Sequence, residues 1–144
     1  MTTDLVESIT QKRAEATSRE VRAVYPDATV SIEVSGERGI ITAYQERYVL
    51  SKEFVESESS LRNPRLLVEY AHVLQAKSRL VVLVPRDRAA AVRLRLLELN
   101  NWWLCYYQLH YYEEGGGIKM IDRRTFRRLM GLPPDDPPRG IEVA

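Results

Sequence analysis

Five consecutive apolar residues, Leu80–Val84, constrain the fold of this chain more than any other segment. The run has no alternation between apolar and polar side chains, which is typical of a strand covered on both faces. The preceding segment predicts a helix, because Asn63 can cap its free amides and Pro64 suits the first helical position. Apolar residues then recur at helical spacing as far as Leu74. A helix that leads into a doubly covered strand predicts a mixed α/β sheet.

The N-terminal half contributes further strands. Thr29–Ser35 alternates between apolar and polar residues, as a half-exposed strand does. Ile40–Tyr44 and Tyr48–Val55 predict two more strands with a short turn between them, or one long bent strand. Residues 4–25 predict a helix that ends before Pro26, because the residue before a proline avoids the helical region.

The C-terminal half predicts another helix and a hairpin. Residues 89–99 have a helical apolar pattern, Trp102–Tyr112 predicts an aromatic strand, and Ile118–Ile121 predicts its partner. A short basic helix, Arg123–Met130, follows. We therefore expect one α/β domain over residues 1–131, with a three-layer mixed central sheet flanked by helices and an added C-terminal β-hairpin. Residues 132–144 carry two Pro-Pro pairs and predict a loose tail.

Composition excludes several classes of protein. The net charge of +1 excludes a chain dominated by basic residues. Cys105 is the only cysteine, so neither an internal disulfide nor a thiolate metal cluster can form. No apolar run approaches the ~20 residues that a membrane span needs, and the first residues lack the pattern of a secretion signal. These features predict a cytoplasmic protein with no membrane partner.

The order helix, three strands, helix, strand over residues 5–84 resembles the core of the PD-(D/E)XK, or restriction-endonuclease-like, superfamily. In that family an Asp on the second strand and the Glu and Lys of a Glu-x-Lys on the third bind one or two divalent ions. The bound ion lowers the pKa of its water and so supplies the nucleophile for cleavage. The resemblance places Glu53 at the position of the family's Glu, where it would be a metal ligand and a catalytic residue.

The other key positions depart from the family pattern. Val55 stands at the position of the lysine, and Lys52, one residue before Glu53, is expected on the opposite face of its strand. The second strand, Ile40–Tyr44, contains no acid. The resemblance therefore implies a nuclease-like, DNA-binding protein with a degenerate metal site. If the protein is active, it implies an Mg²⁺-dependent endonuclease with Glu53 and Lys52 as catalytic residues; otherwise it implies no cofactor.

Clustered arginines are the candidate contacts for nucleic acid. Arg123, Arg124, Arg127 and Arg128 occupy adjacent rows of the predicted basic helix. They can contact phosphates, or they can form a solvated helix face; the sequence leaves both interpretations open. The two histidines, His72 and His110, have no neighbouring set of metal ligands, which favours structural roles.

The aromatic segment Trp102–Tyr112 supports an alternative function. It could stack on the bases of single-stranded nucleic acid, but it lacks the interleaved basic residues of such a platform. A strand packed by helices on one face and by a second subunit on the other is the favoured interpretation, since Tyr and Trp are enriched in interfaces. The chain would then be a homodimeric assembly or interaction protein without catalytic activity.

Overall fold

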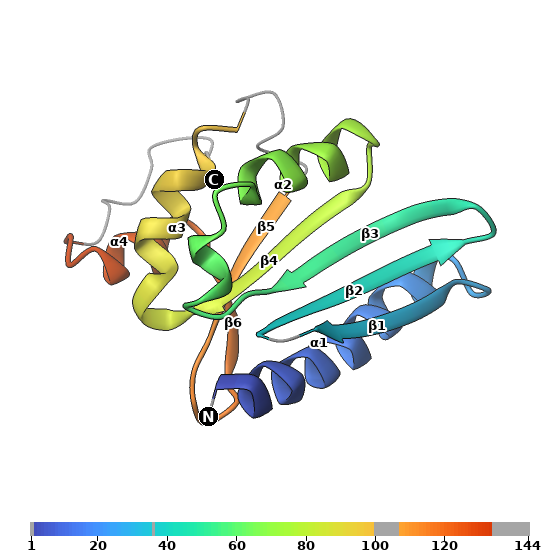
Figure 1. Ribbon diagram of the computed structural model, residues 1–144, viewed down its shortest axis with the longest axis horizontal. Coiled ribbons are helices and arrows are strands. Elements are labelled where there is room, and N and C mark those ends of the chain that lie inside the picture. The colour runs from blue at the N-terminus through green and yellow to red at the C-terminus, as the bar shows by residue number, and fades with distance from the viewer. Residues whose placement is uncertain (1, 36, 100–106, 134–144) are drawn as a thin grey trace, which may run out of the picture.

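A computed structural model describes residues 2–35, 37–99 and 107–133 and shows a six-stranded sheet with helices on both faces (Figure 1). The strands are β1 (Thr29–Ser35), β2 (Arg38–Gln45), β3 (Tyr48–Val55), β4 (Arg79–Pro85), β5 (Tyr107–Tyr112) and β6 (Ile118–Met120). The helices are α1 (Thr2–Val24), α2 (Leu66–Gln75), α3 (Ala89–Leu96) and α4 (Arg123–Leu129), with 3-10 turns η1 (Ser60–Arg62) and η2 (Arg86–Arg88).

The order of strands in the sheet follows their order in the chain, from β1 at one edge to β6 at the other. β1, β2 and β3 pair antiparallel, β4 and β5 continue parallel to β3, and β6 returns antiparallel to β5. Each parallel connection runs through a helix, α2 or α3, as a crossover between parallel strands requires. The predicted mixed α/β architecture is confirmed, and the two strands at Ile40–Tyr44 and Tyr48–Val55 are separate rather than one bent strand.

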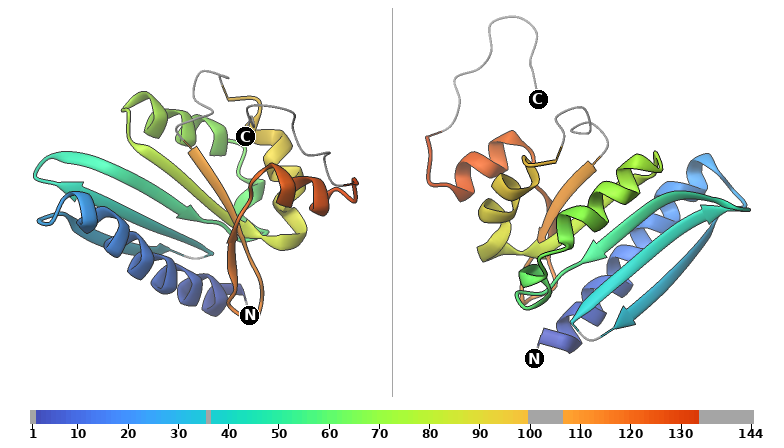
Figure 2. Two further views of the ribbon diagram at one scale, coloured as in Figure 1. Left: turned by 180° about the vertical axis from the view of Figure 1, so that it is seen from behind. Right: turned by 45° about the horizontal axis from the view of Figure 1, so that its top comes forward.

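The central strand β4 is buried on both faces, as its unbroken apolar run predicts. Leu80, Val82 and Val84 pack in one core with α2 and α3, whereas Val81 and Leu83 pack in a second core with α1. All five side chains are 0% exposed. Figure 2 shows the arrangement that this requires, with α1 on one side of the sheet and α2 and α3 on the other. The sheet therefore lies between the two cores.

Helix α1 packs tightly against the sheet at Gly39 of β2. A Cβ at this position would lie 2.0 Å from Oγ1 of Thr10, a buried α1 residue whose hydroxyl donates a hydrogen bond to the carbonyl of Val6. Real Cβ atoms essentially never come this near a non-bonded heavy atom, so only glycine allows α1 to lie at this distance from β2.

Gly39→Ala is expected to destabilise the protein by roughly 1–3 kcal/mol, because the added methyl group overpacks the contact between α1 and β2. Gly115→Ala is the matched control, since a Cβ at Gly115 meets nothing within 4 Å. Urea denaturation of both variants measures the difference. Equal midpoints for the two would show that α1 moves away from the sheet without loss.

The described half of the aromatic segment lies inside the protein. Tyr107 and Tyr111 are each 8% exposed and pack in the core beneath α2 and α3, and β5 is flanked by β4 and β6. The expectation that this strand offers one face to a second subunit is therefore not met for residues 107–112. Residues 102–106 lie outside the described part of the chain, as do residues 134–144 of the predicted tail.

Candidate functional site

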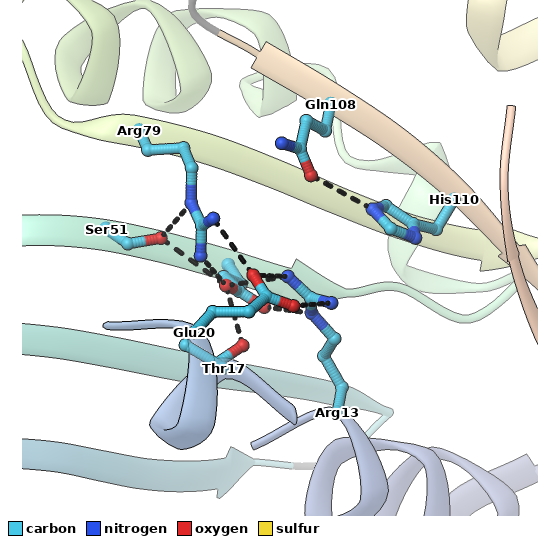
Figure 3. Close-up of polar contacts among 8 residues, drawn as sticks. Arg13, Thr17, Glu20, Ser51, Arg79, Gln108 and His110 are labelled. Atoms are coloured by element: carbon cyan, nitrogen blue, oxygen red, sulfur yellow. Dashed lines mark hydrogen bonds and ion pairs between the residues drawn. The ribbon is translucent and has the colours of Figure 1, made fainter. Parts of the chain in front are cut away.

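Polar side chains from three elements converge on the face of the sheet that α1 covers (Figure 3). Arg13, Thr17 and Glu20 come from α1, where spacings of four and three residues place them on one side of the helix. Ser51 and Glu53 alternate along β3 and so share a face, and Arg79 begins the neighbouring strand β4. We call these six residues the Glu53 network.

The carboxylate of Glu53 is fully buried and is bound by two guanidinium groups. Arg13 donates from Nε to Oε1 at 2.7 Å and from Nη2 to Oε2 at 3.3 Å. Arg79 donates from Nη2 to Oε2 at 3.0 Å. Hydroxyl groups of Thr17 (2.8 Å) and Ser51 (3.4 Å) also donate to Oε2. Four of these five contacts converge on Oε2 and one reaches Oε1, so both oxygens of Glu53 are engaged by donors.

Glu20 completes the network on its solvent side. Its carboxylate contacts Nη1 of Arg13 at 3.2 Å and Nη1 of Arg79 at 3.1 Å, and its side chain is 44% exposed. The network thus holds two positive and two negative charges and is neutral overall. Burial alone would lower the pKa of Arg13, but the hydrogen bond and charge of Glu53, aided by Glu20, outweigh burial and raise it. The guanidinium therefore stays charged.

The two predicted catalytic residues are not brought together. Glu53 faces α1, whereas Lys52 lies on the opposite face of β3, with its Nζ 5.9 Å from the ring centroid of Phe54. Ile41 of β2 is the direct register partner of Glu53 in β3. Ile41 and Val55 are both apolar and fully buried. Neither neighbour supplies the second carboxylate or the lysine that the resemblance implies.

The surroundings of Glu53 do not fit a divalent metal ion. Mg²⁺ needs carboxylate oxygens with open lone pairs, and two guanidinium groups at hydrogen-bond distance would repel it. Among the described residues, no group of three or more His, Cys, Asp or Glu side chains could hold a metal. Arginine side chains occupy the place where the resemblance would put the cation.

Sequence reasoning missed Arg13, Glu20 and Arg79. The signal that could have found Arg13 was an interruption of the apolar stripe of α1. Arg13 and Thr17 are buried between the apolar residues Ile9 and Val21, so the buried side of the helix becomes polar for two turns. A buried polar stretch on a helix requires partners in the facing sheet.

His110 on β5 faces the same side of the sheet as the Glu53 network. Its Nε2 lies 3.2 Å from Oε1 of Gln108, and the residue is 6% exposed. Burial, followed by the positive charge of Arg13, lowers the pKa of His110 to about 4; Glu20 opposes this shift, and Arg79 adds a smaller lowering effect. His110 is therefore neutral at pH 7.

A second buried carboxylate, Glu56, lies directly after β3. It accepts hydrogen bonds from Nη2 of Arg38 at 2.9 Å, from the hydroxyl of Ser60 at 3.0 Å and from the hydroxyl of Tyr70. Arg38 also binds Glu69 of α2 at 2.7 Å. Burial, followed by the charge of Glu56, raises the pKa of Tyr70. These contacts tie β2, β3 and α2 together, and they engage both carboxylate oxygens of Glu56.

The helices on the other face of the sheet carry the clustered arginines. In α4, Arg124 and Arg128 are exposed, and Arg127 donates to the carbonyl of Pro133 at 3.0 Å. The side chain of Arg123 lies outside what the structure describes. Arg93 of α3 packs over the ring of Phe126 at 5.5 Å, which joins the two helices.

Several arginines on this side of the sheet form no ion pair in the part of the chain that the structure describes, although Arg62 acts electrostatically on Glu58 and Arg124 on Asp122. Within the described residues, six arginines on or beside α2, α3 and α4 form no ion pair. They are Arg62, Arg65, Arg93, Arg95, Arg124 and Arg128. We call them the arginine face. Three exposed acids beside these helices, Asp87, Glu98 and Asp122, leave this surface with an excess of positive charge.

Comparison with protein-family models, with curated proteins and with solved structures found no match. The function must therefore be inferred from the residues themselves. None of the described helices combines the length and the apolar character needed to cross a membrane.

Proposed function

We propose that this protein is a non-catalytic nucleic-acid-binding protein built on a restriction-endonuclease-like core. The element order α1–β1–β2–β3–α2–β4, with β4 parallel to β3, supports the resemblance. The strands β5 and β6 and the helix α4 are additions to that core.

The Glu53 network supports a protein without catalytic activity. Metal-dependent cleavage needs carboxylates that are free to bind the ion, and Glu53 is already bound by Arg13 and Arg79. Arg13 cannot lose its proton to make room, because its pKa is raised. The network holds α1 against β3 and β4, which is a structural task.

The arginine face is the observation that carries the binding function. Arginine presents a planar fork of donors that matches a phosphate, and an arginine without an acidic partner can form that contact without first breaking an ion pair. Four of the six side chains of the arginine face lie on α3 and α4, and the other two lie in η1 and directly before α2, on the side of the sheet opposite the Glu53 network. Such a surface favours a polyanion that spans several helices.

Replacing Arg124 and Arg128 by serine is expected to weaken the binding of labelled DNA and RNA. It is also expected to lower the magnitude of the slope of log affinity against log salt concentration by about 1–2, because each phosphate that is no longer neutralised contributes about 0.7–0.9. Fluorescence anisotropy between about 50 mM and about 200 mM salt measures both quantities. The control pair, Arg19→Ser with Arg47→Ser, removes equal charge from exposed positions on α1 and on the turn between β2 and β3.

Three results would contradict the proposal. No binding at low salt would remove the function itself. An equal loss in the two double variants would mean that overall charge, and not the arginine face, attracts the polyanion. Cleavage of the same oligonucleotides with Mg²⁺, abolished by Glu53→Gln, would show a working metal site.

A further inference from the structure

A small hollow between η1 and α3 lies within the arginine face. Its volume is about 210 Å³, below the ~300–1,000 Å³ of clefts that hold drug-sized ligands, so it fits a single ring system. Leu61, Ala91 and Val92 line it with apolar atoms, and Arg62, Arg88 and Arg95 surround them. An apolar recess beside cations matches a ligand with one flat apolar part and one anionic part.

The arginines are held in different ways. Arg95 donates from Nη1 to the carbonyl of Leu61 at 3.0 Å, which fixes its guanidinium beside the hollow. Arg62 is exposed and forms no ion pair within the described residues, whereas Arg88 pairs with Glu58. The three positive charges of the arginines and the single negative charge of Glu58 give the lining of the hollow a net charge of +2.

The larger cavity nearby has the opposite charge. It measures about 750 Å³, and its lining includes Arg86 and Arg128 together with Glu58, Asp87, Glu113 and Glu114, a net charge of −2. Inside this cavity Arg86 and Arg128 face four acids, so a phosphate is favoured less within it than in the hollow between η1 and α3. The charge, more than the size, separates the two sites.

We infer that this hollow binds one unpaired nucleotide of a single strand, with the base on Leu61, Ala91 and Val92 and the phosphate on Arg62, Arg88 and Arg95. The inference rests on the proposed function and names its substrate class. A base in a duplex is stacked on both faces and cannot enter such a recess, whereas a base of a single strand can turn outward. Stacking of a base on an aromatic side chain raises affinity by about 5- to 150-fold, and the aliphatic lining of this hollow is expected to act at the low end of that range.

The test fills the hollow without touching an arginine. Ala91 is exposed, so Ala91→Trp is compatible with folding, and Leu94→Trp places the same side chain at another exposed position of α3. The probes are a labelled single strand, a duplex of equal length, an abasic strand and a phosphoserine peptide of matched charge. Ala91→Trp is expected to lower affinity for the single strand about 5-fold, the low end of the range for one base contact, and to leave the duplex unchanged. Leu94→Trp is expected to change neither.

The outcomes separate this inference from the proposed function. Two results would contradict the nucleotide site while leaving the arginine face in place. In the first, the protein binds the duplex, and it binds the single strand and the abasic strand with equal affinity. In the second, Ala91→Trp lowers the affinity for the single strand and for the duplex by the same factor. If Ala91→Trp weakens the phosphoserine peptide more than the single strand, the hollow takes phosphorylated protein instead. If no nucleic acid binds, both proposals fail.

Discussion

Glu53→Ala is expected to lower the free energy of unfolding by about 3–5 kcal/mol, because it leaves a charged guanidinium buried without its main partner. Arg13 is 7% exposed at its side chain, and its remaining acidic contact is Glu20 at 3.2 Å. Arg79 loses the same partner but is 28% exposed and can be solvated in part. The hydroxyls of Thr17 and Ser51 also lose the acceptor that they share.

Chemical denaturation followed by circular dichroism measures this loss. Glu20→Ala is the matched control, since it removes a carboxylate from the same two arginines at a side chain that is 44% exposed. Its expected effect is about 0–1 kcal/mol. Similar losses in the two variants would show that water reaches Glu53 and that its burial does not set the strength of the network.

Stability is also expected to fall as pH decreases from about 6.5 to about 4, with about 3 kcal/mol of the loss due to His110. The folded-state pKa of His110 is lowered to about 4 by burial and then by Arg13, so the unfolded chain binds the proton more readily in this interval. The contribution of the neutral ring to the free energy of unfolding is therefore fully present above about pH 6.5, and it is lost as the pH falls through about 4.

Denaturation profiles at a series of pH values isolate this contribution from that of the carboxylates. His110→Gln is expected to flatten the profile between about pH 6.5 and about pH 4. His72→Gln replaces an exposed histidine of α2 and is expected to keep the profile of the unsubstituted protein. If His110→Gln keeps the same slope as well, the ring is protonated in the folded protein without penalty.

The sequence predicts most of the elements because their patterns are local. Alternation fixes Thr29–Ser35 to the residue, and the apolar run at Leu80–Val84 identifies the strand with helices on both faces. The helix expected from Asn63 begins instead at Leu66, because Asn63 Oδ1 accepts from the amide of Arg65 in a turn before the helix.

The Glu53 network could not be predicted in the same way. Its members are separated by as many as 66 residues in the chain, from Arg13 to Arg79, and they meet only once α1 packs on the sheet. Strand alternation correctly separates Lys52 from Glu53, but no local pattern indicates whether a carboxylate will face a metal or an arginine. That choice depends on helix α1, which the resemblance treats only as a covering element.

The strand order of the sheet has a consequence for folding during synthesis. Each strand pairs with the one that precedes it in the chain, so a growing polypeptide can complete every pairing as soon as the next strand emerges. α1 is made first and packs on β1 and β2, the next strands to appear. Glu53 is the exception: Arg13 is present when it is made, but Arg79 arrives only with β4.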